Sequence, residues 1–304
     1  MFQKTIKNKI KITGKGLHTG KISTVRMLPA PENTGVLFCR TDLKERPLIS
    51  AIIENVSHTN RRTVIQKNGV IIETVEHLLA AIYAYSIHNI IIEIDGEEIP
   101  ILDGSAKIFV QEIEKSGVID QKKRITQIQI PHYFKVEDPV DNSKIEFYPQ
   151  KNLEIEVSIN YQSCVLPIQK AQLKNLKNFK QDISQARTFC FLHEIKHLVD
   201  ENLIKGGDLQ NSVVFIEKKT PIKTLGKLLS FLPKQIRVLE KGVLNNTKMI
   251  YENEQAKHKL LDLIGDISLA GFDIKGKIIA NKPGHKINTM FTKKLKENII
   301  KSMN

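Results

Sequence analysis

Residues 254–272, which read EQAKHKLLDLIGDISLAGF, predict the helix around which the fold is built. His258, Asp262 and Asp266 recur every fourth residue, so they share one face of an α-helix. A histidine and a carboxylate one turn apart can reach the same divalent cation. The alternative is an amphipathic helix with a solvated polar face, and this helix taken alone favours that simpler interpretation. The other side of the helix carries apolar residues that would face a core: Leu260, Leu261, Leu263, Ile264 and Ile267.

Length and cysteine content limit the class of protein. A chain of 304 residues is long enough for two domains or one large one with an ample core. The three cysteines, Cys39, Cys164 and Cys190, have no CxxC spacing, which argues against a disulfide framework or a thiolate zinc ribbon. The N-terminus alternates polar and apolar residues instead of forming a signal peptide, and no stretch approaches about 20 apolar residues. We therefore expect a soluble, cytoplasmic protein.

The net charge of +13 would suit an anionic partner. The excess is mostly lysine in a chain also rich in isoleucine and asparagine, a composition that an A+T-rich genome produces without selection for binding. The sequence shows no aromatic and basic RNA platform, helix-turn-helix pattern or Cys/His finger. We expect no nucleic-acid partner and at most peripheral membrane contact. A basic nucleic-acid or anion-binding protein with a structural His/Asp metal site remains the alternative function.

The first part of the chain predicts strands and two loop histidines. Residues 3–12 and 21–28 alternate like two strands around a glycine-rich turn that contains His18. His58 lies in a basic cluster with Arg61 and Arg62 near another strand. Both histidines are candidate substrate contacts. The alternatives are an ordinary loop histidine for the first and a solvated basic edge for the second.

Residues 71–86, IIETVEHLLAAIYAYS, predict a second helix with polar residues at its start. Thr74 is the expected N-cap, which places Glu76 and His77 in the first turn. A glutamate there also complements the helix dipole, and that alternative is sufficient for this motif alone. A histidine beside a carboxylate can equally combine a zinc ligand with a base that activates water.

The remaining pattern predicts an α+β fold with two units. The first covers residues 1–120, the linker QKKRITQ covers 121–127, and the second covers 128–304 with a βαβ insert near 188–216. The insert is unusually apolar, which indicates either core packing or a groove for an aliphatic chain. Residues 218–257 are lysine-rich, with a short helix and a strand expected among them, and their function is not indicated. The turn KPGH would aim His285 from the end of a strand.

Several motifs in one order resemble a known family. TVEH, ILDGSA, ARTF, IKGGDLQN, HKLLDLIGD and KPGH together are similar to the UDP-3-O-acyl-N-acetylglucosamine deacetylases, the zinc amidases of lipid A biosynthesis. The resemblance runs from about residue 4 to residue 294. It implies two similar β-α-α-β sandwich domains with the active site between them, and a UDP-linked acylated amino sugar as substrate.

The resemblance also implies roles for single residues. His77, His258 and Asp262 would be the metal ligands, with a water in the open position; zinc is expected, although Fe²⁺ accepts the same ligands. Glu76 would be the general base and His285 the general acid, oriented by Asp266. The remaining implied catalytic residues are Thr188, which would hold the oxyanion, and Lys259, which would also bind substrate.

The substrate contacts implied by the resemblance lie mostly in the insert. Phe189 would lie against the sugar, and residues 191–212 would form the acyl passage. We include His18 and His58 in this set on the argument above. The candidate substrate contacts are Phe189, Phe191, Leu192, Ile195, Leu203, Ile204, Gly207, Ser212, Lys259, His18 and His58.

The chain departs from some relatives in two ways. The stretch between Ser212 and His258 is longer than in the shortest family members and more like members that carry a C-terminal dehydratase domain. The chain ends at Asn304, so we expect no second enzyme in it, and we expect a monomer.

Overall fold

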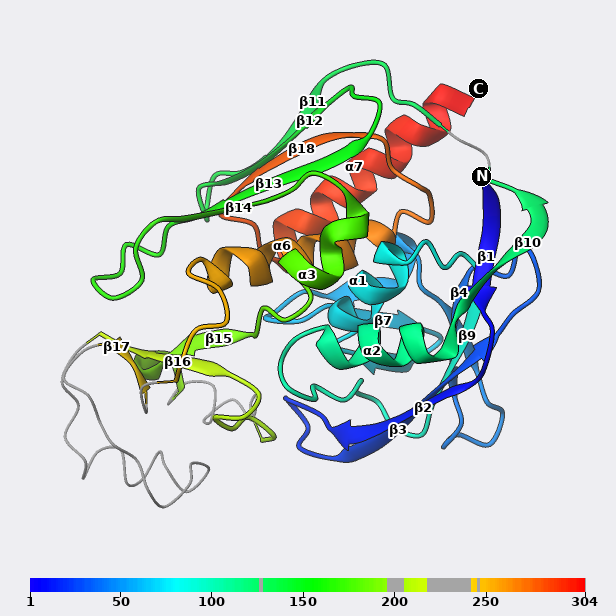
Figure 1. The fold of residues 1–304 in the computed structure, drawn as a ribbon, viewed down its shortest axis with the longest axis horizontal. Coiled ribbons are helices and arrows are strands. Elements are labelled where there is room, and N and C mark those ends of the chain that lie inside the picture. The colour runs from blue at the N-terminus through cyan, green and yellow to red at the C-terminus, as the bar shows by residue number, and fades with distance from the viewer. Residues whose placement is uncertain (126–127, 196–204, 218–241, 245–246, 304) are drawn as a thin grey trace.

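The computed structural model describes residues 1–125, 128–195, 205–217, 242–244 and 247–303. The fold is α+β, as predicted: two five-stranded sheets lie on the outside and the long helices lie between them (Figure 1). The core is continuous across the two halves, because buried side chains from both sheets and the intervening helices form one apolar cluster. The two expected units are therefore present as two halves of the molecule, each with one of the five-stranded sheets, and the halves share one core.

The first sheet has the strand order β2-β3-β9-β4-β5. All its neighbouring pairs are antiparallel except β4 and β9, which are parallel. Isoleucine and valine alternate along these strands with one face buried, which favours a sheet packed on one side. Its strands are β2 (Ile10–Lys15), β3 (Ile22–Pro29), β4 (Val36–Arg40), β5 (Leu48–Ser50) and β9 (Ile90–Ile94).

The second sheet repeats this topology with the order β11-β12-β18-β13-β14. Again one pair is parallel, here β13 with β18, and it occupies the same place in the order. The repetition confirms the prediction of two similar units. Its strands are β11 (Phe134–Asp138), β12 (Ser143–Tyr148), β13 (Leu153–Ile159), β14 (Gln169–Leu173) and β18 (Gly276–Asn281).

Each half also contains a three-stranded sheet. In addition, the strands at the beginning and at the end of the first half pair with each other. The first small sheet consists of β6 (Val56–His58), β7 (Val64–Lys67) and β8 (Val70–Glu73). The second consists of β15 (Phe189–Phe191), β16 (Val213–Ile216) and β17 (Gly242–Val243), with β15 parallel to β16. The strands that border the first half are β1 (Phe2–Ile6) and β10 (Val118–Arg124).

Four long helices fill the space between the large sheets: α1 (Glu76–Ala84), α2 (Lys107–Ser116), α6 (Glu254–Ser268) and α7 (His285–Met303). Short helical segments are η1 (Ile53–Asn55), η2 (Leu176–Asn178) and α3 (Phe179–Asp182). Helix α1 packs directly on α6, and Gly265 makes this possible. A Cβ atom at Gly265 would lie 2.1 Å from the backbone oxygen of Glu76, so only glycine permits this approach.

Three local predictions need correction. Residues 3–12 form two strands in different sheets instead of one, because the chain turns after Ile6. Thr74 does not cap α1: it has a positive φ of 58°, and its hydroxyl donates to Glu98, so Val75 takes the N-cap position. His285 is the first residue of α7 and not a loop residue.

The boundary between the halves differs in detail from the expected linker. Residues 121–124 belong to β10 and pair with β1, while 126–127 lie outside the described residues. The division into domains at 121–127 stays a prediction. So does the expected helix and strand after residue 218, because 218–241 and 245–246 also lie outside the described residues. Among the described helices, none is both long and apolar enough to cross a bilayer.

Candidate metal centre and active site

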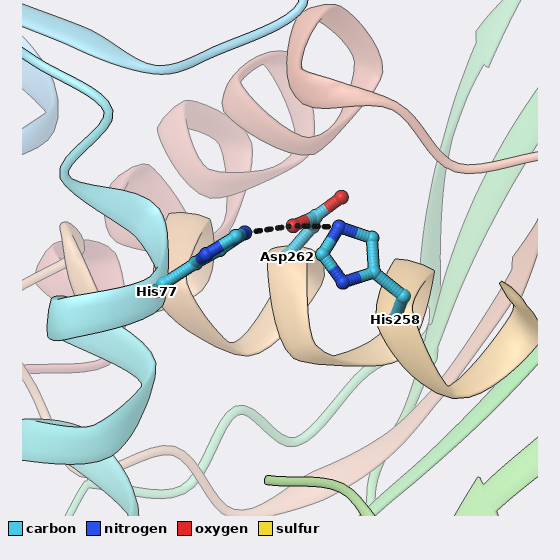
Figure 2. Close-up of side chains that lie close together, drawn as sticks. All are labelled: His77, His258 and Asp262. Carbon is cyan, nitrogen blue, oxygen red and sulfur yellow. Dashed lines mark ion pairs between the residues drawn. The ribbon is translucent and has the colours of Figure 1, made fainter. Parts of the chain in front are cut away.

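Two helices from different halves bring three candidate metal ligands together (Figure 2). His77 comes from the first turn of α1, and His258 and Asp262 lie one turn apart on α6. Nε2 of His77 and Nε2 of His258 each lie 3.5 Å from Oδ1 of Asp262. One ligand atom from each residue lies within 4.8 Å of the others, and all three side chains are buried.

The chemistry of these three side chains fits a divalent cation. Nδ1 of His258 donates to the backbone oxygen of Ala186 at 3.0 Å, which leaves Nε2 with its lone pair directed at the group. Burial is the main reason that the pKa of His258 falls to about 3, so this imidazole is neutral near pH 7. Oδ1 of Asp262 is buried and accepts no hydrogen bond from the described residues. A cation bound between these atoms would satisfy all of them.

Lys259 pairs with the other oxygen of the same carboxylate. Its Nζ lies 2.9 Å from Oδ2 of Asp262. Burial alone would lower the pKa of Lys259, but Asp262 raises it above its ordinary value, so the amine is charged. Burial has the opposite effect on Asp262 and would raise its pKa. The neighbouring His258 and Lys259 outweigh burial and hold that pKa well below its usual range. The site therefore contains a charged carboxylate and a charged lysine at neutral pH.

Glu76 and His285 face each other beside this group. Oε1 of Glu76 lies 3.7 Å from Nε2 of His285, and both side chains are buried. Burial raises the pKa of Glu76. Burial would lower the pKa of His285, but the carboxylate of Asp266, 2.9 Å from Nδ1, raises it to about 9. A base whose proton affinity is increased thus lies opposite an imidazole that is protonated at neutral pH.

Thr63 forms hydrogen bonds to Glu76 and to Asp266, the partner of His285. No sequence pattern indicated this role. The backbone N–H of Thr63 donates to Oε2 of Glu76 at 3.1 Å, and its hydroxyl donates to Oδ1 of Asp266. The residue is fully buried. Asn288, on α7, also escaped prediction; its side-chain amide donates to Oδ2 of Asp266 at 2.8 Å. Such residues carry no signal in one sequence, because their importance comes only from the groups they meet in the fold.

A cavity of about 150 Å³ opens beside the group. It has apolar walls and several polar groups, an arrangement typical of ligand sites. Eight predicted site residues line it: His18, Thr188, Phe189, Ile195, Gly207, Ser212, Lys259 and His285. The other lining residues were not among the candidate substrate contacts: Leu17, Arg61, Cys190, Asp208 and Val214. Arg61 is paired with Glu194 at 2.8 Å.

The insert closes this cavity by packing on the turn between β2 and β3. The backbone N–H of Gly206 donates to the oxygen of Leu17 at 3.0 Å, and a Cβ at Gly206 would lie 1.9 Å from the oxygen of Gly16. Glu98 holds the turn in place, because its carboxylate accepts from the backbone N–H groups of His18 and Thr19. The wall of the cavity is thus assembled from both halves of the chain.

A second glycine places Thr188 at the cavity. The backbone N–H of Thr188 donates to the oxygen of Gly104 at 2.8 Å. Gly104 has a φ of 81°, and a Cβ there would lie 2.0 Å from the oxygen of Asn211. The glycine of the ILDGSA motif therefore allows three segments of chain to meet.

Other predicted contacts lie elsewhere. Phe191 is buried among Leu166, Val213 and Phe215, and Leu192 packs in another apolar cluster; neither of the two lines the cavity. His58 is exposed at the end of β6 and does not reach it either. The predicted contacts Leu203 and Ile204 lie outside the described residues.

Comparison with known proteins places this arrangement in a family. Residues 3–226 and 230–297 match the family model described as UDP-3-O-acyl N-acetylglycosamine deacetylase. A protein of Thermodesulfovibrio yellowstonii named UDP-3-O-acyl-N-acetylglucosamine deacetylase is 37% identical, with 97% of this chain and 92% of the relative covered. One of the same name from Nitratiruptor is 35% identical over 98% of this chain and 91% of the relative.

Another relative is a longer protein. The bifunctional enzyme LpxC/FabZ of Bacteroides thetaiotaomicron is 42% identical over 298 residues, which are 98% of this chain. The chain spans 65% of the length of that relative. These matches extend over nearly all of the sequence. The chain therefore belongs to the family of UDP-3-O-acyl N-acetylglycosamine deacetylases.

Proposed function

We propose that this chain is a metal-dependent amidohydrolase that removes acetate from UDP-3-O-acyl-N-acetylglucosamine in lipid A biosynthesis. The observation that carries the proposal is the buried group of His77, His258 and Asp262 with Glu76 and His285 facing each other beside it. Family membership supplies the substrate class. Zinc is the expected metal, and Fe²⁺ would suit the same nitrogen and oxygen ligands.

His77, His258 and Asp262 would hold the metal and leave a position open for substrate or water. A divalent cation held there would supply Lewis-acid chemistry: it would polarise the amide carbonyl and make a nearby water more acidic. Glu76 acts as general base and takes the proton of the attacking water with the oxygen not held by Thr63. Its raised pKa, caused by burial, makes it a stronger base than an exposed glutamate.

His285 acts as general acid toward the leaving nitrogen. Its Nδ1 is held by Asp266, so Nε2 is the atom that faces the reacting group. With a pKa of about 9, the imidazole carries its proton at neutral pH. When the tetrahedral intermediate collapses, Nε2 gives that proton to the amine, the C–N bond breaks, and acetate departs.

Other residues position the substrate. Thr188 at the cavity edge would donate its hydroxyl to the developing oxyanion, and Lys259 supplies a buried positive charge to the same region. The ring of Phe189 lies next to both Lys259 and His258, where it can contact the sugar. Ile195, Gly207 and Ser212 line the adjoining cavity, which we assign to the acyl chain.

The proposal also includes the oligomeric state, the cellular location and the domain division of the enzyme. We infer that the chain acts as a monomer in the cytoplasm, with residues 1–120 and 128–304 as its two domains. The relatives named bifunctional enzyme LpxC/FabZ extend beyond the region that this chain matches, so the activity proposed here is that of the matched region alone.

Acetate release tests the proposal. Purified protein loaded with zinc should release one acetate for each UDP-3-O-acyl-N-acetylglucosamine consumed. A substrate whose acyl chain is present but whose acetyl group has been removed should release none. Hydrolysis of the ester-linked acyl chain in place of the acetamide would contradict the proposed reaction.

A further inference from the structure

A second, larger cavity of about 420 Å³ lies where the two halves meet, toward the C-terminal ends of α1 and α6. It shares no lining residue with the cavity beside Phe189. In Figure 1 these helix ends lie near β1 and β10, which border the first half of the chain. Its volume is within the range of about 300–1,000 Å³ typical of small-molecule sites.

The interior of this cavity is mainly apolar. Leu79, Ile82 and Ile87 form one side, from α1 and the turn that follows it. Ile52 and Phe272 complete the wall from the segment before η1 and the segment after α6. Phe272 and Ile52 are half-buried, so they retain surface that a ligand could cover. An apolar body would therefore gain free energy by entering.

One edge of the cavity is cationic. Lys123 and Arg124, at the end of β10, both line it and both are exposed. In the described part of the chain no carboxylate lies within ion-pair distance of either side-chain cation. The carboxylate of Glu32 accepts from the backbone N–H of Lys123 at 2.8 Å, and the guanidinium of Arg124 lies over the ring of Phe2, 5.8 Å from its centroid. These two charges are thus available to an anion.

The acidic residue of the cavity lining, Asp273, is hydrogen-bonded to His88. Nδ1 of His88 accepts from the backbone N–H of Lys4 at 3.0 Å, so Nε2 carries the ring proton. That nitrogen lies 3.3 Å from Oδ2 of Asp273 and donates to it. The carboxylate is therefore turned toward His88 and keeps its negative charge, so the lining carries two cations, Lys123 and Arg124, against one anion, and its net charge is positive.

We propose that this second cavity binds a single-chain carboxylate, with the hydrocarbon chain among Leu79, Ile82 and Phe272 and the carboxylate at Lys123 and Arg124. The apolar interior and the unpaired cationic edge match the two parts of such a ligand. A neutral or cationic amphiphile lacks one of the two attractions.

Photolabelling tests this assignment without relying on activity. Dodecanoate carrying a diazirine near its methyl end is added to the full chain below its micellar concentration, irradiated, and the labelled peptides are identified by mass spectrometry. Label is expected in residues 79–87 or 268–273, which are separate in sequence from the walls of the other cavity. Label confined to residues 188–195 and 205–214 would overturn the proposal, because it would mean that only the cavity beside Phe189 accepts the chain.

Charge reversal identifies the carboxylate contact. The double variant Lys123→Glu/Arg124→Glu should lower label in residues 79–87 on the order of tenfold, because two attractions become repulsions. Lys122→Glu, on the same strand but outside the lining, is the matched control and should leave that label unchanged. Equal label in the double variant and the control would overturn the proposal, and circular dichroism verifies that both remain folded.

Two further labelling experiments define the class of ligand. A matching dodecanol probe should label residues 79–87 less than dodecanoate does, and equal labelling would overturn the role of the carboxylate. Vesicles of phosphatidylglycerol, which also combine acyl chains with negative charge, should not displace the dodecanoate probe. Displacement would mean that this face binds a lipid surface instead of a single chain.

Discussion

Nδ1 of His285 lies 2.9 Å from Oδ2 of Asp266, and the two side chains form a buried pair that joins α6 to α7. Asn288 donates to the same oxygen and Thr63 to the other one. A carboxylate that is satisfied on both oxygens holds the imidazole in a single orientation. The consequence is that Nε2 points toward Glu76, where the proposed reaction needs an acid.

Asp266→Asn should change the pH dependence of the enzyme. The general acid works in its protonated form, so kcat/KM should fall as the pH rises through the pKa of His285, about 9. Without the charge of Asp266, only Glu76 and Asp262 still oppose the effect of burial on that pKa, so the basic limb should move to lower pH. The pH profile of kcat/KM checks this, with the exposed Asp120→Asn as control. A basic limb that stays in place would assign it to another group.

Removal of a proposed ligand should remove metal and activity together. His77→Ala and Asp262→Ala each take away one of three donors that lie within 4.8 Å of one another. Metal analysis of the purified variants and acetate assays should show both losses in parallel. His132→Ala, which changes an exposed histidine bonded to Asn298, is the matched control and should retain one metal. Full metal content in both ligand variants would refute the assignment.

Thr63→Val should lower kcat by about tenfold with little change in KM. The substitution removes the hydroxyl that donates to Asp266 but keeps the backbone N–H that donates to Glu76, and one buried hydrogen bond has an effect of this size. Thr63→Ser restores the hydroxyl and should recover most of the rate. Steady-state kinetics of the two variants separate a positioning role from packing alone; equal rates for valine and serine would show that the hydroxyl is not needed.

Gly265→Ala should weaken the contact between α1 and α6. The new methyl group would lie 2.1 Å from the oxygen of Glu76, so the helices must separate. Overpacking of this kind lowers the free energy of unfolding by about 1–3 kcal/mol. Chemical denaturation measures the change, and metal affinity should fall as well because the ligands come from both helices. Gly284→Ala, where a Cβ meets nothing within 4 Å, is the control; a Gly265→Ala protein as stable as the control would contradict the packing argument.

Shortening the acyl chain of the substrate should lower kcat/KM stepwise. The cavity beside Phe189 is lined by Ile195 and Val214, and each buried methylene is worth up to roughly 0.8 kcal/mol. Ser212→Phe should narrow this cavity and shift the preference toward shorter chains. An unchanged kcat/KM down to a very short acyl group would show that the cavity does not hold the chain.

The sequence predicted the parts of the site that depend on local periodicity. His258, Asp262 and Asp266 share a face because they are spaced by one helical turn, and Glu76 and His77 follow from the start of α1. The family motifs added His285, which periodicity alone could not connect to the helix. The α+β fold followed from alternating strands and apolar helices, and the structure confirms it.

What the sequence did not predict depends on tertiary contacts. Thr74 has a residue type suited to an N-cap, but Glu98, distant in sequence, takes its hydroxyl and the backbone has a positive φ. Thr63 and Asn288 are ordinary residues whose partners are known only once the halves meet. Phe191 and Phe189 both lie on β15 and contact the same apolar cluster, yet only Phe189 lines the cavity, a difference that composition could not reveal.

The most direct test of the central claim is a titration of acetate release against bound metal. Protein stripped with a chelator and then dialysed should release no acetate from UDP-3-O-acyl-N-acetylglucosamine, and activity should return in proportion to added Zn²⁺ up to one equivalent per chain. His258→Ala should not recover under the same titration. Full acetate release by the stripped protein, or recovery of the His258→Ala variant at one equivalent, would contradict catalysis at the His77, His258 and Asp262 group.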